Sequence, residues 1–367
     1  MVEEVLFIAP VLGCGGYVSH ALGILKGIYK KVDIKCVPLS YVGVTKRDKE
    51  MSDILNQTIN NKVSEFAPII WLTLPSNVKY MPNRFNINIT TFEADKICSE
   101  WVMVGKAMDL TIVTCNFLKE VWNNCGVEKV EVLEEGVDLN TFNDKIRPLP
   151  LMYKGKLISD VFEHRILICV ELSNRKNVRN AVLSFKNAFS GRKDVCLILK
   201  ASYMEQHKNI EYWLGDIDLS DVYVFLIDQF LPDEAIPSLF QVATCYFSLS
   251  CGEGWDLNCV QMGAMKKPVI VPYHTAYSHY LNDDRAFLIK KYKKIPAIQD
   301  NILDRFFKGS NWFLPDIDEA VDILKYYIKS SSTEKENKIN SFYNYIRDYL
   351  TWDKIGDKLI EILNNRF

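Results

Sequence analysis

The sequence has ten cysteines, but it has no CxxC pair and no cysteine–histidine spacing that suits zinc. Several of the cysteines lie in apolar, strand-like stretches, where a small buried thiol is expected: Cys36, Cys115, Cys169, Cys196 and Cys245. The five histidines, among them His207, form no metal-binding spacing either. We therefore expect no metal site and a reduced, cytoplasmic protein.

Long hydrophobic stretches are also missing, since none approaches the roughly 20 apolar residues of a membrane-spanning helix. The opening Met1-Val2-Glu3-Glu4 is acidic where a signal peptide has a basic start, so neither a signal peptide nor a transmembrane segment is expected. Charge of one sign does not dominate, because 44 Lys+Arg oppose 46 Asp+Glu for a formal net charge of -2. Nucleic acid is therefore not an expected partner.

What the sequence does contain is a repeated alternation of short β-branched stretches with helical patterns, which predicts parallel sheets with crossover helices. In the first half we expect helices at 17–31 and 116–124, and strands at 4–10, 34–39, 68–74, 85–92, 110–115 and 130–134. The periodicity fails near 143–163, which predicts a linker. It then resumes, with helices expected at 178–189, 232–242 and 257–266, and strands at 165–170, 194–200, 222–227, 244–249 and 268–271.

At 367 residues the chain exceeds what one hydrophobic core usually serves. The pattern therefore predicts an α/β protein with two doubly wound domains, at 1–147 and 160–345. Helices are expected from 317 onward, with the polar stretch 330–340 as a connection between them.

The most informative segment is CGEGWDLNCVQMGAMKKPVIVP at 251–272. A glycine-bracketed loop between a parallel strand and a helix places backbone N–H groups where open α/β sheets bind anionic ligands. Glu253 can accept hydrogen bonds from sugar hydroxyls at such a loop, and Gln261 follows two helical turns further on. From spacing alone, an ordinary strand-to-helix turn is the simpler interpretation.

This segment resembles the signature loop of retaining GT-B glycosyltransferases of the family-four, or group 1, type. The matching residues are Glu253, Gly254, Trp255, Leu257, Ala264, Met265, Lys267, Pro268, Val269 and Ile270. In the family the first glutamate, here Glu253, contacts the donor sugar, and the second, replaced by Gln261, holds the ribose. Asp256 and Asn258 also depart from the pattern, and a carboxylate at Asp256 is expected to repel the donor diphosphate.

Two further segments extend the resemblance. FIAPVLGCGGYVSHALGILKGI at 7–28 resembles the first strand, glycine loop and first helix, so Gly15 and Gly16 are expected to let backbone approach a phosphate or the acceptor. The loop lacks GxGxxG, the fingerprint of dinucleotide-binding dehydrogenases, so the sequence does not indicate a protein of that class. In TFEAD at 91–95, Glu93 matches a residue expected near the reacting sugar carbon. A hydrogen-bonded loop carboxylate is the alternative interpretation of Glu93.

A third segment, ELSNRKN at 171–177, follows a predicted strand. Lys176 matches a family lysine that contacts the donor diphosphate, while Glu171 replaces the family arginine. Arg175 is a candidate for the second positive charge. Without the resemblance, Arg175 and Lys176 are typical of a solvated helix start.

The resemblance implies the GT-B fold: two Rossmann-like domains facing each other across a cleft, with a C-terminal helix, 350–367, that crosses back to the N-terminal domain. It implies retaining, metal-independent transfer of a sugar, a hexose in particular, from a UDP- or GDP-sugar to a glycan, lipid-linked or protein acceptor, without a cofactor. The predicted catalytic residues are Glu93, Lys176 and Glu253. The predicted substrate-binding residues are Gly15, Gly16, Arg175, Gly254, Trp255, Asp256, Leu257 and Gln261.

Two alternatives remain open at this point. Glu171, Asp256 and Gln261 also suit a catalytically impaired GT-B protein that acts as a nucleotide-sugar-binding or assembly subunit. A sugar-nucleotide epimerase on the same plan is the second alternative. Asp216-Ile-Asp218 and Asp316-Ile-Asp318 have the spelling of a metal-binding DxD motif, but we expect both to be solvated turns.

Overall fold

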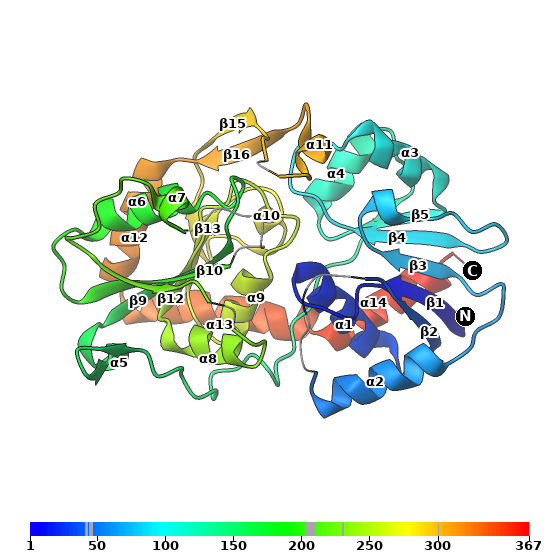
Figure 1. Cartoon of the computed structure of the whole chain (residues 1–367), viewed down its shortest axis with the longest axis horizontal. Helices are drawn as coiled ribbons and strands as arrows, with labels where there is room; N and C mark the ends of the chain where they lie inside the picture. Colours follow the sequence, from blue (N-terminus) through cyan, green and yellow to red (C-terminus); the bar gives the residue numbers. More distant parts are fainter. Residues whose placement is uncertain (41–42, 44–46, 203–209, 230, 300, 367) are drawn as a thin grey trace. The chain divides into compact units, whose positions relative to one another are not determined.

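The computed structural model describes residues 1–40, 43, 47–202, 210–229, 231–299 and 301–366, so His207 lies outside the described residues. The chain divides into two compact units (Figure 1). Unit 1 comprises Met1–Asp138 and Arg347–Phe367, and unit 2 comprises Leu139–Ile346. Residues 139–147, assigned above to the first domain, therefore belong with unit 2. In the described part of the chain, no helix is both long enough and apolar enough to cross a membrane.

Unit 1 is built on a six-stranded parallel sheet in the order β2-β1-β3-β4-β5-β6. Its strands are β1 Glu4–Ala9, β2 Asp33–Pro38, β3 Ile69–Leu72, β4 Asn86–Thr90, β5 Leu110–Val113 and β6 Val130–Val132. Every residue of β3, β4 and β5 is buried, as expected for strands covered on both faces. The strand order reverses between β1 and β3, which makes this pair the topological switch point of the sheet.

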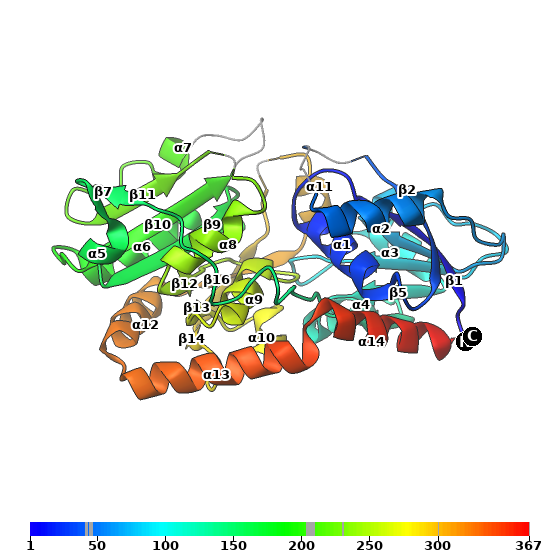
Figure 2. The same cartoon turned by 90° about the horizontal axis from the view of Figure 1, so that it is seen from below.

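The helical elements of unit 1 are α1 Gly16–Ile28, α2 Lys49–Asn60, η1 Pro75–Asn77, α3 Ser99–Ala107, α4 Asn116–Asn124 and α14 Trp352–Asn364. Helices α1 and α14 pack closely, although more than 300 residues separate them (Figure 2). A Cβ atom on Gly27 would lie 2.3 Å from the carbonyl oxygen of Trp352, and one on Gly356 would lie 2.1 Å from that of Gly27. Glycine at both positions lets the two backbones touch.

Unit 2 has a second six-stranded parallel sheet, in the order β11-β10-β9-β12-β13-β14. Its strands are β9 His164–Glu171, β10 Val195–Ser202, β11 Tyr223–Ile227, β12 Cys245–Phe247, β13 Val269–Pro272 and β14 Phe287–Ile289. Numbered from β9, this is the 3-2-1-4-5-6 order of the Rossmann fold, and its switch point lies between β9 and β12.

The helices of unit 2 are α5 Ile158–Val161, α6 Val178–Phe189, α7 Ile210–Leu214, α8 Ala235–Val242, α9 Leu257–Ala264, α10 Tyr277–Tyr280, α11 Asp304–Phe307 and α12 Ile317–Lys329. Helix α13, Ser332–Tyr349, runs from unit 2 into the second segment of unit 1. Two small antiparallel pairs complete the unit: β7 Met152–Tyr153 with β8 Lys156–Leu157, and β15 Tyr292–Pro296 with β16 Asn311–Pro315.

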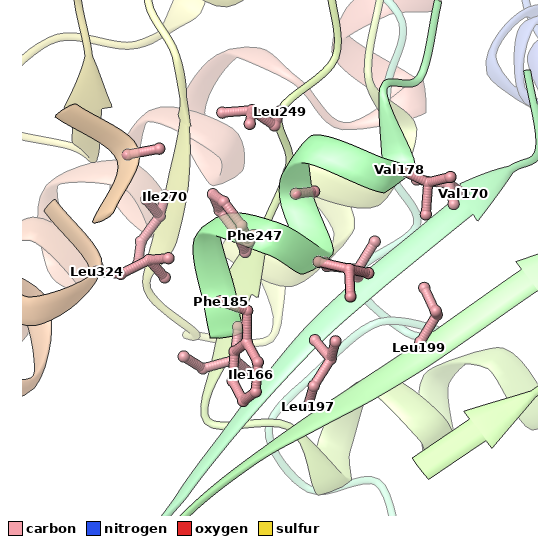
Figure 3. Packing of buried hydrophobic residues seen from close by; sticks show 14 of the residues in the cluster. Ile166, Val170, Val178, Phe185, Leu197, Leu199, Phe247, Leu249, Ile270 and Leu324 are labelled. Carbon is pink, nitrogen blue, oxygen red and sulfur yellow. The ribbon is translucent and has the colours of Figure 1, made fainter. Parts of the chain in front are cut away.

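One hydrophobic core of unit 2 lies between its sheet and helices α6 and α12 (Figure 3). Alternate strand residues point into it, such as Ile166 of β9 and Leu197 and Leu199 of β10. They pack with Phe185 of α6 and Leu324 of α12. The alternation follows from the two-residue period of a strand, which sends the intervening side chains to the opposite face.

Two expectations about the chain between elements were wrong. Most of the predicted connection 330–340 is the first half of α13, whose buried residues, Phe342 and Ile346, come only near its end. The predicted linker 143–163 contains the β7–β8 pair and the short helix α5.

Candidate functional site

The candidate site lies on the two loops that leave the switch point of unit 2. Residues 172–177 connect β9 to α6, and residues 248–256 connect β12 to α9. At a switch point the two connections turn to opposite sides of the sheet, which opens a crevice outside the carboxyl ends of the strands. Arg175 and Lys176 lie on the first loop and Glu253 on the second.

These three side chains form an ion-paired cluster. Arg175 Nη1 lies 2.9 Å from Glu253 Oε2, and Lys176 Nζ lies 2.5 Å from Glu253 Oε1. The glutamate side chain is only 4% exposed, whereas those of Arg175 and Lys176 are 13% and 17% exposed. Burial raises the pKa of Glu253, but Lys176 and Arg175 outweigh it, so the pKa lies below its usual value. The cluster of two cations and one carboxylate therefore keeps one net positive charge.

Hydrogen bonds to backbone atoms, two of which involve a side chain, hold the two loops in place. Asn177 adopts a left-handed conformation at the start of α6, and its Nδ2 donates to the carbonyl of Leu249 at 3.0 Å. The Glu253 N–H donates to Thr275 Oγ1 at 3.1 Å, and the Ala276 N–H donates to the carbonyl of Glu253. Asn177 and Thr275 are positioning residues that the sequence did not single out. Asparagine's tolerance of left-handed backbone is the signal available for Asn177.

Asp256 does not lie as expected. Its carboxylate is buried, and Oδ2 accepts hydrogen bonds from Tyr246 Oη at 3.0 Å and Tyr277 Oη at 2.7 Å. Oδ1 accepts from the Cys259 N–H and caps α9. The side chain therefore organises the loop from inside, bonded to Tyr246, Tyr277 and the Cys259 N–H, and the repulsion of a diphosphate by this carboxylate stays a prediction.

We predict that Asp256→Gly, which loses the cap and both phenol bonds, lowers the free energy of unfolding by about 2–4 kcal/mol. Asp256→Asn should cost less than about 1 kcal/mol, because an amide keeps the cap and can donate to the phenols. Burial, then Glu253, raises the pKa of Asp256, so ionising this group costs stability as pH rises above about 4. Denaturant unfolding at several pH values checks this. The free energy of unfolding of the asparagine variant should rise relative to that of the wild type toward neutral pH. A glycine variant as stable as wild type would contradict the assignment.

The remaining predicted residues of this loop differ in accessibility. Trp255 is buried, with its ring centroid 4.6 Å from that of Tyr280, and Gly254 is buried beside it. Leu257 and Gln261 are half-buried and lie four residues apart on α9, hence on one face of the helix. Trp255 thus packs in the interior, while Gln261 is partly exposed.

The other predicted residues belong to unit 1, at the carboxyl ends of its strands. Gly15 and Gly16 are exposed at the start of α1, and Gly15 has a φ of 115°, which favours glycine. Tyr17 Oη accepts from the Thr91 N–H at 3.3 Å, which ties the start of α1 to the end of β4. Glu93 follows two residues later and is half-buried.

Potential metal ligands lie elsewhere. Among the described residues, Glu163, His164 and Asp194 place their ligand atoms within 4.8 Å of one another, but they lie at the amino ends of β9 and β10, the edge opposite the candidate site. Of the DxD-like pairs, Asp216 binds Arg179 and Asp316 caps α12.

No protein-family model and no curated protein sequence matches the chain. Solved structures do. Anabaena HepE in complex with UDP-glucose has 13% identity and a TM-score of 0.66, with 99% of each chain covered. The sucrose-phosphate synthase of Thermosynechococcus elongatus has 12% identity and a TM-score of 0.62, over 100% of this chain and 99% of the other.

Staphylococcus aureus TarM, in a complex that includes UDP, has 12% identity and a TM-score of 0.58. The match covers 81% of this chain but spans only about half, 55%, of the TarM chain. Together with the two parallel six-stranded sheets, these similarities show that the chain has the GT-B fold with two Rossmann-like domains.

Proposed function

We propose that the protein is a glycosyltransferase that moves a sugar, a hexose in particular, from a nucleotide-diphosphate sugar to an acceptor hydroxyl. The observation that carries the proposal is the cluster of Arg175, Lys176 and Glu253 on two loops at the switch point of unit 2. Cations suit a diphosphate, and a fixed carboxylate suits sugar hydroxyls. The fold shared with structures that hold UDP or UDP-glucose supports a UDP-sugar donor, with a GDP-sugar as the alternative.

In this proposal Lys176 and Arg175 stabilise the negative charge that develops on the departing diphosphate. Glu253 binds hydroxyls of the sugar, and Gln261 binds the ribose. Gly15, Gly16 and Glu93 of unit 1 bind a glycan, lipid-linked or protein acceptor, with Glu93 close to the reacting hydroxyl. Asp256 and Trp255 shape the loop from inside. Retention of configuration and independence from metal are part of the proposal.

We predict that one of UDP, GDP and ADP stabilises the protein by about 2.7 kcal/mol at about 100 times its dissociation constant, with or without EDTA. Thermal unfolding with each nucleotide measures this. Lys176→Met should remove most of the shift, whereas Lys186→Met, a lysine of α6 near Asp221, should keep it. Binding that needs added Mg²⁺ or Mn²⁺ would contradict the metal-independent part, and no binding by any nucleotide would contradict the donor site.

A catalytically impaired, nucleotide-sugar-binding subunit is the second candidate. Glu171, at the carboxyl end of β9, is exposed and places a negative charge at the edge of the sheet that carries the candidate site. Gln261 is also a weaker ribose ligand than a carboxylate. Tight nucleotide-sugar binding without transfer to any acceptor and without donor hydrolysis would favour this candidate.

A further inference from the structure

A lysine is buried in the sheet of unit 2 near the candidate site. Lys200 lies on β10 between Leu199 and Ala201, which both point into the core beside α6. Lys200 therefore points to the opposite face, where it is 5% exposed. Its Nζ donates to the carbonyl of Ala201 at 3.1 Å, and no carboxylate of the described residues lies within ion-pair distance of it.

Such a lysine is costly for the folded protein. Removing an ammonium group from water costs several kcal/mol unless charge and hydrogen bonds compensate, and among the described residues the Lys200 amine donates only to one neutral carbonyl, that of Ala201. Burial lowers the pKa of Lys200, while Cys169 and Asp228 act weakly in the other direction. Buried, incompletely paired charges near the carboxyl end of a parallel strand commonly mark ligand sites.

The position of Lys200 links it to the candidate site. Its hydrogen bond to the next residue's carbonyl places the amine toward the carboxyl edge of the sheet. Lys200 pairs in register with Cys169 of β9, whose carbonyl accepts from Asn258 Nδ2 in the first turn of α9. Both the amine and the first turn of α9 thus lie around Cys169; Asp256 already caps that helix end, so the amine is the group that favours an anion there.

We propose that Lys200 binds a phosphate oxygen of the nucleotide diphosphate, as a third cation supplied by the strand next to the switch point. This inference rests on the proposed function, since it adds a contact to the same donor. The bound phosphate provides the counter-charge that Lys200 lacks in the free protein. Arg175 and Lys176 already share Glu253, so Lys200 is the cation with the least compensation before the ligand arrives.

The test is calorimetric titration of wild type, Lys200→Met and Lys267→Met with UDP, GDP and ADP. Lys267 is the matched control: it is a half-buried lysine whose Nζ lies 3.4 Å from the carbonyl of Gln241, and it precedes β13 at the amino edge of the same sheet. For the tightest-binding nucleotide, Lys200→Met should bind about tenfold to a hundredfold more weakly. Lys267→Met should remain within about twofold of wild type.

Two further readouts separate a phosphate contact from a structural role. Without ligand, Lys200→Met should melt no lower than wild type, because methionine fills similar space without a charge to desolvate. Between about 0.05 M and 0.3 M salt, the affinity of wild type should fall more steeply than that of the variant, because one ionic contact is missing in the variant. Equal salt dependence would overturn the assignment to phosphate.

Lys200→Gln provides a second variant should methionine prevent folding, and the same loss of affinity is expected. Binding by either folded variant within about twofold of wild type would overturn the role of Lys200 alone. If wild type binds none of the three nucleotides, the donor site itself is wrong, and the inference fails with it.

Discussion

Replacing Glu253 by glutamine should lower the transfer rate about a hundredfold or more while tightening the binding of bare nucleotide diphosphate about tenfold. The two effects have different causes. A carboxylate that binds sugar hydroxyls contributes to the transition state, so its loss slows transfer. The same carboxylate occupies Arg175 and Lys176 in the free protein, so its neutralisation releases two cations for phosphate.

Transfer assays and calorimetric titration with the bare diphosphate measure the two effects separately. Glu336→Gln is the control, because this glutamate is exposed on α13 and has no such ion pairs among the described residues. It should change neither quantity by more than about twofold to threefold. Weaker diphosphate binding by Glu253→Gln would mean that the carboxylate orients the cations more than it competes for them. Unchanged turnover would remove Glu253 from the catalytic residues.

Glu253 is buried, so its substitution also changes stability. Its pKa lies below the ordinary 4.5, so its ion pairs stabilise the fold above about pH 4.5 and are lost as pH falls through the folded-state pKa. Glu253→Gln should therefore show less acid sensitivity than wild type. Alanine, which also leaves a cavity, is the poorer probe.

Gly356→Ala should lower the free energy of unfolding by at least about 3 kcal/mol. The added Cβ would lie 2.1 Å from the carbonyl oxygen of Gly27 and 2.9 Å from its Cα, so backbone must move. Both contacts are to main chain of α1, which cannot turn aside as a side chain can. Alanine's higher helix propensity, about 1 kcal/mol, offsets only part of this cost.

Chemical denaturation of Gly356→Ala and Gly16→Ala measures the change in the free energy of unfolding that each substitution causes. Gly16 is the matched control, because it also lies in a helix, and a Cβ there would meet no atom within 4 Å. Gly16→Ala should leave stability unchanged or raise it by a few tenths of a kcal/mol. A Gly356→Ala variant within about 1 kcal/mol of wild type would show that α14 can shift away from α1 at little cost.

The strands were predictable because both sheets are covered on two faces, so strands such as β3 and β10 appear as short, nearly continuous apolar stretches. The strands β14 and β15, within the stretch 270–315, were not predictable, because β14 has only three residues and β15 is almost wholly exposed. The first half of helix α13 was predicted as a connection because its first turns are polar on every side.

The site was predictable only in part. The family resemblance, and not the spacing alone, singled out Arg175, Lys176 and Glu253, and the structure brings their side chains together. The orientation of the Asp256 side chain could not be predicted from the sequence. It depends on Tyr246 and Tyr277, which lie 10 residues before it and 21 residues after it. Lys200 is a single polar residue in an apolar strand, and only its burial in the structure singles it out as a candidate ligand-binding residue.

Unit 1 is closed by a segment that the ribosome makes only after unit 2. Helix α14 and residue Thr351, which bridges to Val137, become available only after the 208 residues of Leu139–Ile346 have been synthesised. At about 5–20 residues per second this takes roughly 10–40 seconds, during which the nascent first segment lacks the helix that covers Gly23 and Gly27 of α1. Unit 2 is continuous in the chain and can fold during that interval. Unit 2 can therefore complete its fold before unit 1 does, which is the reverse of the usual N-terminal-first order.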